Sequence, residues 1–127
     1  MRAQFVRGKE PKQAMDLGLK TWDNIKPGDI ILPKKEVNVS AKGHLSSAGS
    51  GDTIWKDMVL LVLLVQKFLD PELGKNIIYL NYFKCWDLPE ALRRKNEPLD
   101  HIPARRMFGT RQQMENRFEI LQRKDES

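Results

Sequence analysis

The chain has few of the residues from which disulfide frameworks and metal sites are built. Its 127 residues include one cysteine, Cys85, and two histidines, His44 and His101. A single cysteine excludes an intramolecular disulfide and favours a reducing compartment. The sequence contains no CxxC or HExxH spacing, so nothing indicates a metal site or a nucleophile–base pair made from these side chains. We therefore predict no metal, no cofactor and no catalytic residue.

Long apolar segments and a targeting signal are also missing. Residues 58–65 form an unbroken apolar run of eight residues, whereas a membrane-spanning helix needs roughly 20. The first residues, MRAQFVRGKEPKQ, lack the apolar core of a secretory signal. We expect a cytoplasmic protein that does not enter the membrane.

The bulk composition is that of an ordinary globular protein. Hydrophobic residues make up 40% and charged residues 31% of the chain, and the length suits a single domain. The net charge is +5: residues 1–50 carry nine Lys/Arg against five Asp/Glu, residues 51–82 three against four, and residues 83–127 ten against eight. Basic flanks around a near-neutral centre permit contact with a polyanion. Solubility alone also favours a net charge of this size.

The densest apolar segment, residues 54–69 (IWKDMVLLVLLVQKFL), is predicted to be the central element of the fold. A buried parallel strand is also continuously apolar. Sixteen residues are long for a strand, however, and Leu, Met, Lys and Gln are good helix formers. Asp52 or Thr53 is a suitable N-terminal cap, and Pro71 prevents continuation beyond Asp70. We predict a helix.

Such a helix is apolar all round, since Leu60 and Leu63 lie between Lys56 and Lys67 on its most polar face. Two interpretations follow. The domain wraps the helix completely, or Leu60 and Leu63 form an interface with a partner protein or a second copy of the chain.

The other predicted elements are shorter. They are a strand at 2–7, a helix from Pro11 to just before Pro27, a hairpin of strands 30–32 and 37–40 with Lys34 and Lys35 at its tip, a flexible loop at 41–51, a strand (preferred over a helix) at 77–83, a helix at 88–95 capped by Asp87, a loop or arm at 96–110, and a helix at 111–124 capped by Thr110. Residues 124–127 are expected to fray. We predict a single small α+β domain, mainly helical, with a central buried helix and a small hairpin or sheet.

The small residues of the loop at 46–53 suit a phosphate-binding turn before a helix. The loop lacks the lysine that a P-loop requires, and Gly51 is followed by the negative charge of Asp52. A flexible loop is the better interpretation.

The basic cluster between residues 93 and 111 is the strongest functional signal. Six cations stand there against two acids, Glu97 and Asp100. Arginine suits bidentate contact with phosphate, and the nearby Phe108 is able to stack on a base. Cations near a helix C-terminus also complement the helix dipole without any ligand. The candidate anion-binding residues are Arg93, Arg94, Lys95, Arg105, Arg106 and Arg111, with Lys34 and Lys35 as a second contribution.

These observations lead to two hypotheses. The first is a small non-enzymatic binding protein that contacts a polyanion, most simply nucleic acid, through the basic arm. The alternative is a structural or assembly subunit that acts by protein–protein contact in a complex or homo-oligomer. Neither hypothesis needs a small-molecule substrate.

Overall fold

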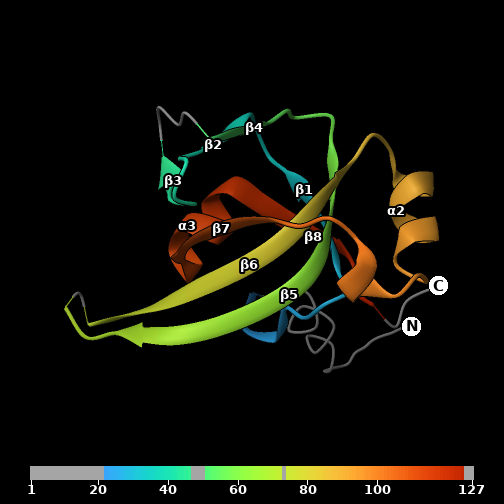
Figure 1. The fold of residues 1–127 in the computed structure, drawn as a ribbon. Helices are drawn as coiled ribbons and strands as arrows, with labels where there is room; N and C mark the ends of the chain where they lie inside the picture. The colour runs from blue at the N-terminus through green and yellow to red at the C-terminus, as the bar shows by residue number, and fades with distance from the viewer. Residues whose placement is uncertain (1–21, 47–50, 73, 125–127) are drawn as a thin grey trace, which may run out of the picture.

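The computed structural model describes residues 22–46, 51–72 and 74–124, and two antiparallel sheets form most of it (Figure 1). One sheet has five strands in the order β7-β6-β5-β1-β8, and the other has three in the order β3-β2-β4. The elements are η2 (Trp22–Asn24), β1 (Ile30–Pro33), β2 (Val37–Val39), β3 (Leu45–Ser46), β4 (Asp52–Ile54), β5 (Val59–Asp70), β6 (Lys75–Cys85), α2 (Leu88–Arg94), η3 (Leu99–His101), β7 (Arg105–Thr110), α3 (Arg111–Arg117) and β8 (Phe118–Gln122). The expectation of a mainly helical fold is therefore wrong.

The predicted central helix is two strands separated by a turn. β4 ends at Ile54, the Met58 amide donates to the Trp55 carbonyl at 3.0 Å, and β5 begins at Val59. Asp52 and Thr53 are not caps but members of β4, where they pair with Val39 and Asn38. Pro71 does end the element, which stops at Asp70.

β5 is apolar on both faces because both faces of its first half are covered. Leu60 and Val62 belong to one core cluster, which also contains Trp22, Tyr82 and Phe118. Val59, Leu61 and Leu63 belong to a second cluster, beneath α2 and Ile102. A strand buried on both faces reads as a continuous hydrophobic run, and only its pairing with β6 and β1 distinguishes it from a buried helix.

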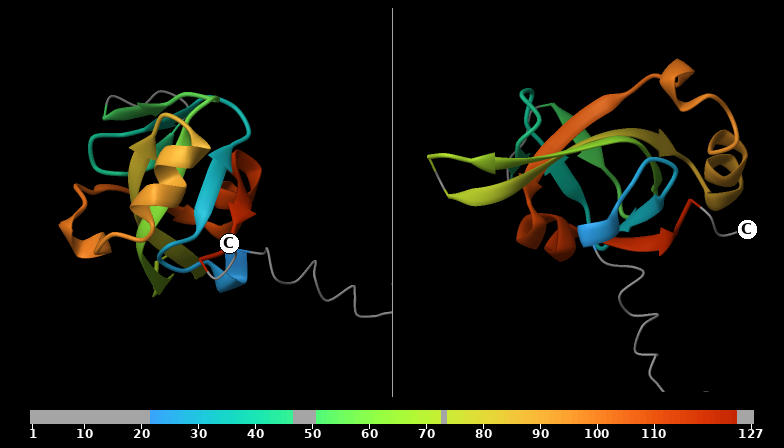
Figure 2. Two further views of the ribbon diagram at one scale, coloured as in Figure 1. Left: turned by 90° about the vertical axis from the view of Figure 1, so that its right-hand side faces the viewer. Right: turned by 90° about the horizontal axis from the view of Figure 1, so that it is seen from below.

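The second half of β5 and the first half of β6 form a long hairpin that projects from the body of the molecule (Figure 1; Figure 2, right). A register shift between Val62 and Leu64 marks the start of this projection. At the tip, the Gly74 amide donates to the Asp70 carbonyl at 2.8 Å, and Gly74 adopts φ 64°. That left-handed conformation favours glycine.

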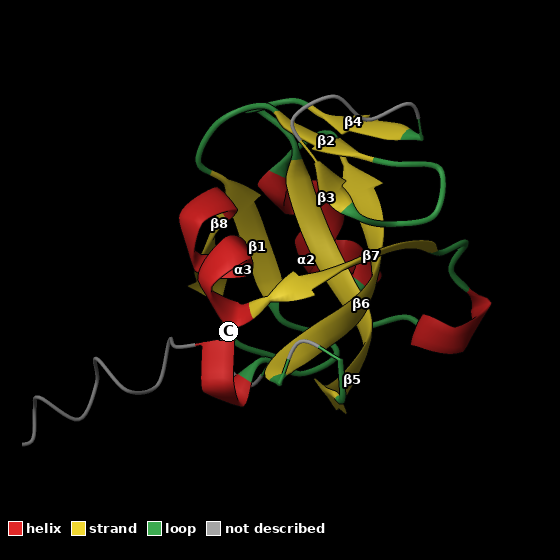
Figure 3. Ribbon diagram, turned by 90° about the vertical axis from the view of Figure 1, so that its left-hand side faces the viewer, coloured by secondary structure: helices red, strands yellow, loops and turns green. Residues whose placement is uncertain are grey.

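The smaller sheet stands at one end of the molecule, away from the β5–β6 hairpin (Figures 1 and 3). The predicted hairpin of 30–32 and 37–40 is wrong, although both strands exist. β1 pairs with β5 and β8 in the large sheet, whereas β2 pairs with β3 and β4 in the small one. The loop predicted at 41–51 contains β3, and the arm predicted at 96–110 contains η3 and β7.

Three local predictions are confirmed. Residues 77–83 are a strand, part of β6. Asp87 caps α2 by accepting from the Glu90 amide, and Thr110 caps α3 by accepting from the Gln113 amide. The helix predicted at 111–124 is too long, because α3 ends at Arg117 and the chain continues as β8. The strand at 2–7 and most of the first helix lie outside the described residues.

None of the helices in the described ranges combines the length and apolar character needed to cross a bilayer.

Candidate functional site

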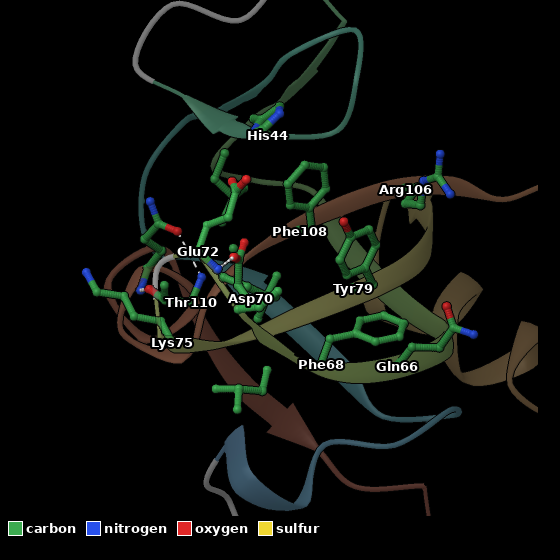
Figure 4. A pocket seen from close by; sticks show the side chains of 16 residues that line it. His44, Gln66, Phe68, Asp70, Glu72, Lys75, Tyr79, Arg106, Phe108 and Thr110 are labelled. Atoms are coloured by element: carbon green, nitrogen blue, oxygen red, sulfur yellow. Dashed lines mark hydrogen bonds between the residues drawn. The ribbon is translucent and has the colours of Figure 1, made fainter.

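An open groove of about 940 Å³ lies on the face of the large sheet where β5, β6 and β7 run side by side (Figure 4). The three strands contribute its floor, and the loop before β3 closes one end with His44. The tip of the β5–β6 hairpin, with Asp70 and Glu72, also lines the groove.

The strand register brings the side chains of the groove together. Gln66 lies opposite Tyr79, Tyr79 opposite Phe108, and Phe68 opposite Ile77. Residues directly opposite share a face of the sheet, and so do residues two apart on one strand. Side chains from β5, β6 and β7 therefore point into one groove.

Four rings form a continuous row across these strands, which we call the ring row: His44, Phe108, Tyr79 and Phe68. The ring centroids of His44 and Phe108 are 4.3 Å apart, and those of Phe108 and Tyr79 are 4.6 Å apart. The Phe108 and Tyr79 rings are stacked, with 10° between their planes. Phe68 meets Tyr79 edge-on at 5.2 Å.

The ring row is accessible to a ligand. The Phe68 side chain is 49% exposed, whereas a core aromatic such as Phe118 is 1% exposed. His44 is also exposed, and Tyr79 and Phe108 are half-buried. Aromatic rings that serve only the hydrophobic core are buried. Exposed rings gathered in a groove are therefore typical of a binding site.

The loop that carries His44 is held against β7 by its backbone. The Phe108 amide donates to the Gly43 carbonyl at 2.8 Å, and His44 bridges to Phe108 in parallel. Gly43 adopts φ 99°, and a Cβ there would lie 3.2 Å from the Phe108 ring. Glycine at this position lets the loop reach β7 and place the His44 ring on Phe108.

Arg105 and Arg106, adjacent in sequence, point to opposite faces of β7. Arg106 lines the groove and is exposed, and its side chain has no ionic partner among the described residues. Arg105 lies 3.8 Å from the Asp52 carboxylate on the other face. Asp52 also accepts from the Tyr82 hydroxyl at 2.7 Å and from the Lys84 ammonium at 2.6 Å. This polar cluster links the small sheet to the large one.

The structure does not bring the other predicted cations into the groove. Arg93 and Arg94 each lie 3.3 Å from Glu97, and Arg94 also covers the Phe83 ring. Lys95 donates to the Gln122 amide oxygen, Lys34 to the Glu115 carbonyl, and Lys35 is exposed outside the groove.

Arg111 lies 2.6 Å from Asp23, and the hydrogen bond to this carboxylate raises the pKa of its guanidinium. Of the eight candidates, Arg106 alone lines this groove.

Leu60 and Leu63 do not form a surface. They are 0% and 8% exposed and pack in the two core clusters, so these two side chains are buried within the domain, although the segment is a strand and not a wrapped helix. The assembly hypothesis stays a prediction, but Leu60 and Leu63 are not available as its interface.

Sequence reasoning found Phe108 and Arg106 but missed His44, Phe68, Tyr79 and Gln66. The available signal was the turn sequence Asp-Pro-Glu-Leu-Gly at 70–74. If this sequence is interpreted as the turn of a hairpin, and not as the end of a helix, then Phe68 and Tyr79 lie close together on neighbouring strands.

Cys85 is buried at 1% exposure, and burial, followed by the charge of Glu90, raises the pKa of its thiol to about 12 from an ordinary value of 9.0. The native thiol is therefore protonated at neutral pH, and we expect thiol reagents to modify it only after unfolding. The pKa of the thiol is higher in the folded than in the unfolded chain. The contribution of the protonated thiol to the free energy of unfolding is therefore complete below pH 9 and is lost as the pH rises from 9 towards 12.

This expectation is checked by measuring the rate of thiol modification with and without denaturant, and by unfolding titrations across the alkaline range. In Cys85→Ala, the free energy of unfolding should depend less on pH in the alkaline range. The remaining dependence is assigned to Tyr82, because burial and the hydrogen bond to Asp52 also raise the pKa of its hydroxyl. A native modification rate equal to that of the unfolded chain contradicts the expectation.

Within the described part of the chain, no three His, Cys, Asp or Glu side chains are grouped as a metal site. Comparisons with protein-family profiles, with curated proteins and with solved structures found no match.

Proposed function

We propose that the protein binds single-stranded nucleic acid in the groove, with unpaired bases against the ring row and a phosphate at Arg106. The observation that carries this proposal is the exposed Phe68 ring at the end of a four-ring row, in the same groove as a cation without an ionic partner among the described residues. Proteins that bind single strands combine these two features, because every base has a face that stacks and every nucleotide carries a phosphate.

The geometry favours unpaired bases over a duplex. In a duplex the base faces are stacked on each other, so an aromatic ring reaches them only when the base is unpaired. The groove also contains the amide side chain of Gln66, which is able to meet a base edge. Contacts to the phosphate would fix the position of the strand, and contacts to the bases would give a sequence preference.

The test is fluorescence anisotropy with a labelled single-stranded RNA, the same sequence as DNA, and the matching duplex. We expect the single strands to bind more tightly than the duplex. Arg106→Ala should weaken binding and reduce the dependence of log K on log salt by about 0.7, the value for one phosphate contact on a single strand.

Arg105→Ala is the matched control, since it removes the same charge from the adjacent residue on the opposite face of β7. It should leave the affinity nearly unchanged. Equal losses for the two variants, or tighter binding of the duplex, would reject the groove as the site.

A further inference from the structure

On the basis of the proposed function, we infer that the groove holds a short unpaired segment of about one or two nucleotides, such as a strand end, loop or bulge, rather than the length of a long strand. Three features of the groove limit the ligand in this way: the free ring faces, the position of the charges and the size of the space.

The ring row offers few free faces. Tyr79 and Phe108 stack on each other at 4.6 Å, so their inner faces are occupied, and His44 lies against Phe108. Phe68 meets Tyr79 edge-on and is 49% exposed, so it presents its own face. The free faces therefore lie at the two ends of the row, on Phe68 and on the exposed His44, and the row does not provide one platform for each ring.

The charges of the groove differ between its two ends. Arg106 lies opposite Asn81, away from the hairpin tip, and attracts a phosphate there. Asp70, Glu72 and Lys75 line the tip, where Asp70 and Lys75 are directly opposite each other. The Glu72 carboxylate thus adds a net negative charge, which repels a phosphate chain that continues over the tip. Figure 4 shows Glu72 and Arg106 on different sides of Tyr79.

The size of the space agrees with this limit. The groove measures about 940 Å³, within the range of about 300–1,000 Å³ that is usual for small-molecule and cofactor sites. A volume of this size suits one or two nucleotides rather than the length of a long strand.

The experiment is a length series: adenosine monophosphate and oligoadenylates of two, four and eight nucleotides, each titrated calorimetrically at several salt concentrations. We expect the affinity per molecule to level off at the dinucleotide, and the salt slope to stay near −0.7 to −1.4, the value for one or two phosphates. An affinity that keeps rising to the octanucleotide, with a slope steeper than about −3, would overturn the inference while leaving the proposed function standing. Absence of binding at every length would reject the proposed function itself.

A charge reversal separates the electrostatic limit from mere lack of space. Glu72→Lys should let longer oligoadenylates bind more tightly than the dinucleotide and should steepen the salt slope. Glu119→Lys, the same change at an exposed position on β8 at the far edge of the sheet, is the matched control and should change neither. Equal effects of the two variants would show that net charge, not the tip of the groove, limits the ligand, and would also overturn the inference.

Discussion

Replacing Asp29 by alanine is expected to lower the free energy of unfolding by about 3–5 kcal/mol, because it leaves the buried guanidinium of Arg123 without its carboxylate. Asp29 is 0% exposed, and its carboxylate accepts from Arg123 at 2.8 Å. It also accepts from the amides of Lys26 and Lys124. A loss of this size is a large part of the 5–15 kcal/mol that is typical of a whole domain.

The position of Asp29 explains why the effect is large. Its carbonyl accepts from the Val62 amide at 2.9 Å, so its backbone joins the start of β1 to β5. Its side chain joins the same point to the residues that follow β8. One carboxylate thus connects the turn before β1, the central strand and the end of the described chain.

Denaturant unfolding monitored by circular dichroism measures the loss. Asp29→Asn keeps the shape of the side chain without its charge and should lie between the wild type and Asp29→Ala. Asp23→Ala is the control, since it breaks the Asp23–Arg111 ion pair, whose side chains are 62% and 53% exposed. Such surface pairs contribute about 0–1 kcal/mol. A loss below about 1 kcal/mol for Asp29→Ala would contradict a stabilising role for this buried pair.

Replacing Phe68 by alanine is expected to weaken single-strand binding by about 5- to 150-fold, which corresponds to the 1–3 kcal/mol that one base contributes by stacking on a ring. Phe68 has an exposed face of the ring row and packs edge-on against Tyr79. Since about half of the side chain is already in solvent, its removal should lower the binding affinity much more than the free energy of unfolding.

The measurement is an anisotropy titration of Phe68→Ala with a single-stranded oligonucleotide, together with a thermal melt that confirms an intact fold. Phe68→Trp should retain binding, because it offers a larger face for stacking. Trp86→Ala is the matched control: Trp86 is 78% exposed and does not line the groove. A loss for Trp86→Ala that equals the loss for Phe68→Ala would place the contact outside the ring row.

Part of the candidate site follows from the sequence and part does not. The presence of Arg106 and Phe108 in a basic, proline-containing segment indicated a nucleic-acid contact. Local patterns gave no reason to separate Arg105 from Arg106, since their opposite orientations depend on β7 pairing with β6. Phe68 and Tyr79 meet because β5 and β6 pair across the turn at 70–74; the turn sequence indicates the hairpin but does not set its register.

Short-range chemistry was decided by the sequence alone. The caps of α2 and α3 depend on hydroxyl or carboxylate oxygens within three residues of the amides that they accept from, and the end of β5 depends on the fixed ring of Pro71. The single cysteine excluded a disulfide without any structure. In contrast, residues 59–63 have the apolar content of either a buried helix or a strand covered on both faces. Only tertiary structure decides between them, because pairing with β6 and β1 and cover from α2 supply hydrogen bonds and burial from distant parts of the chain.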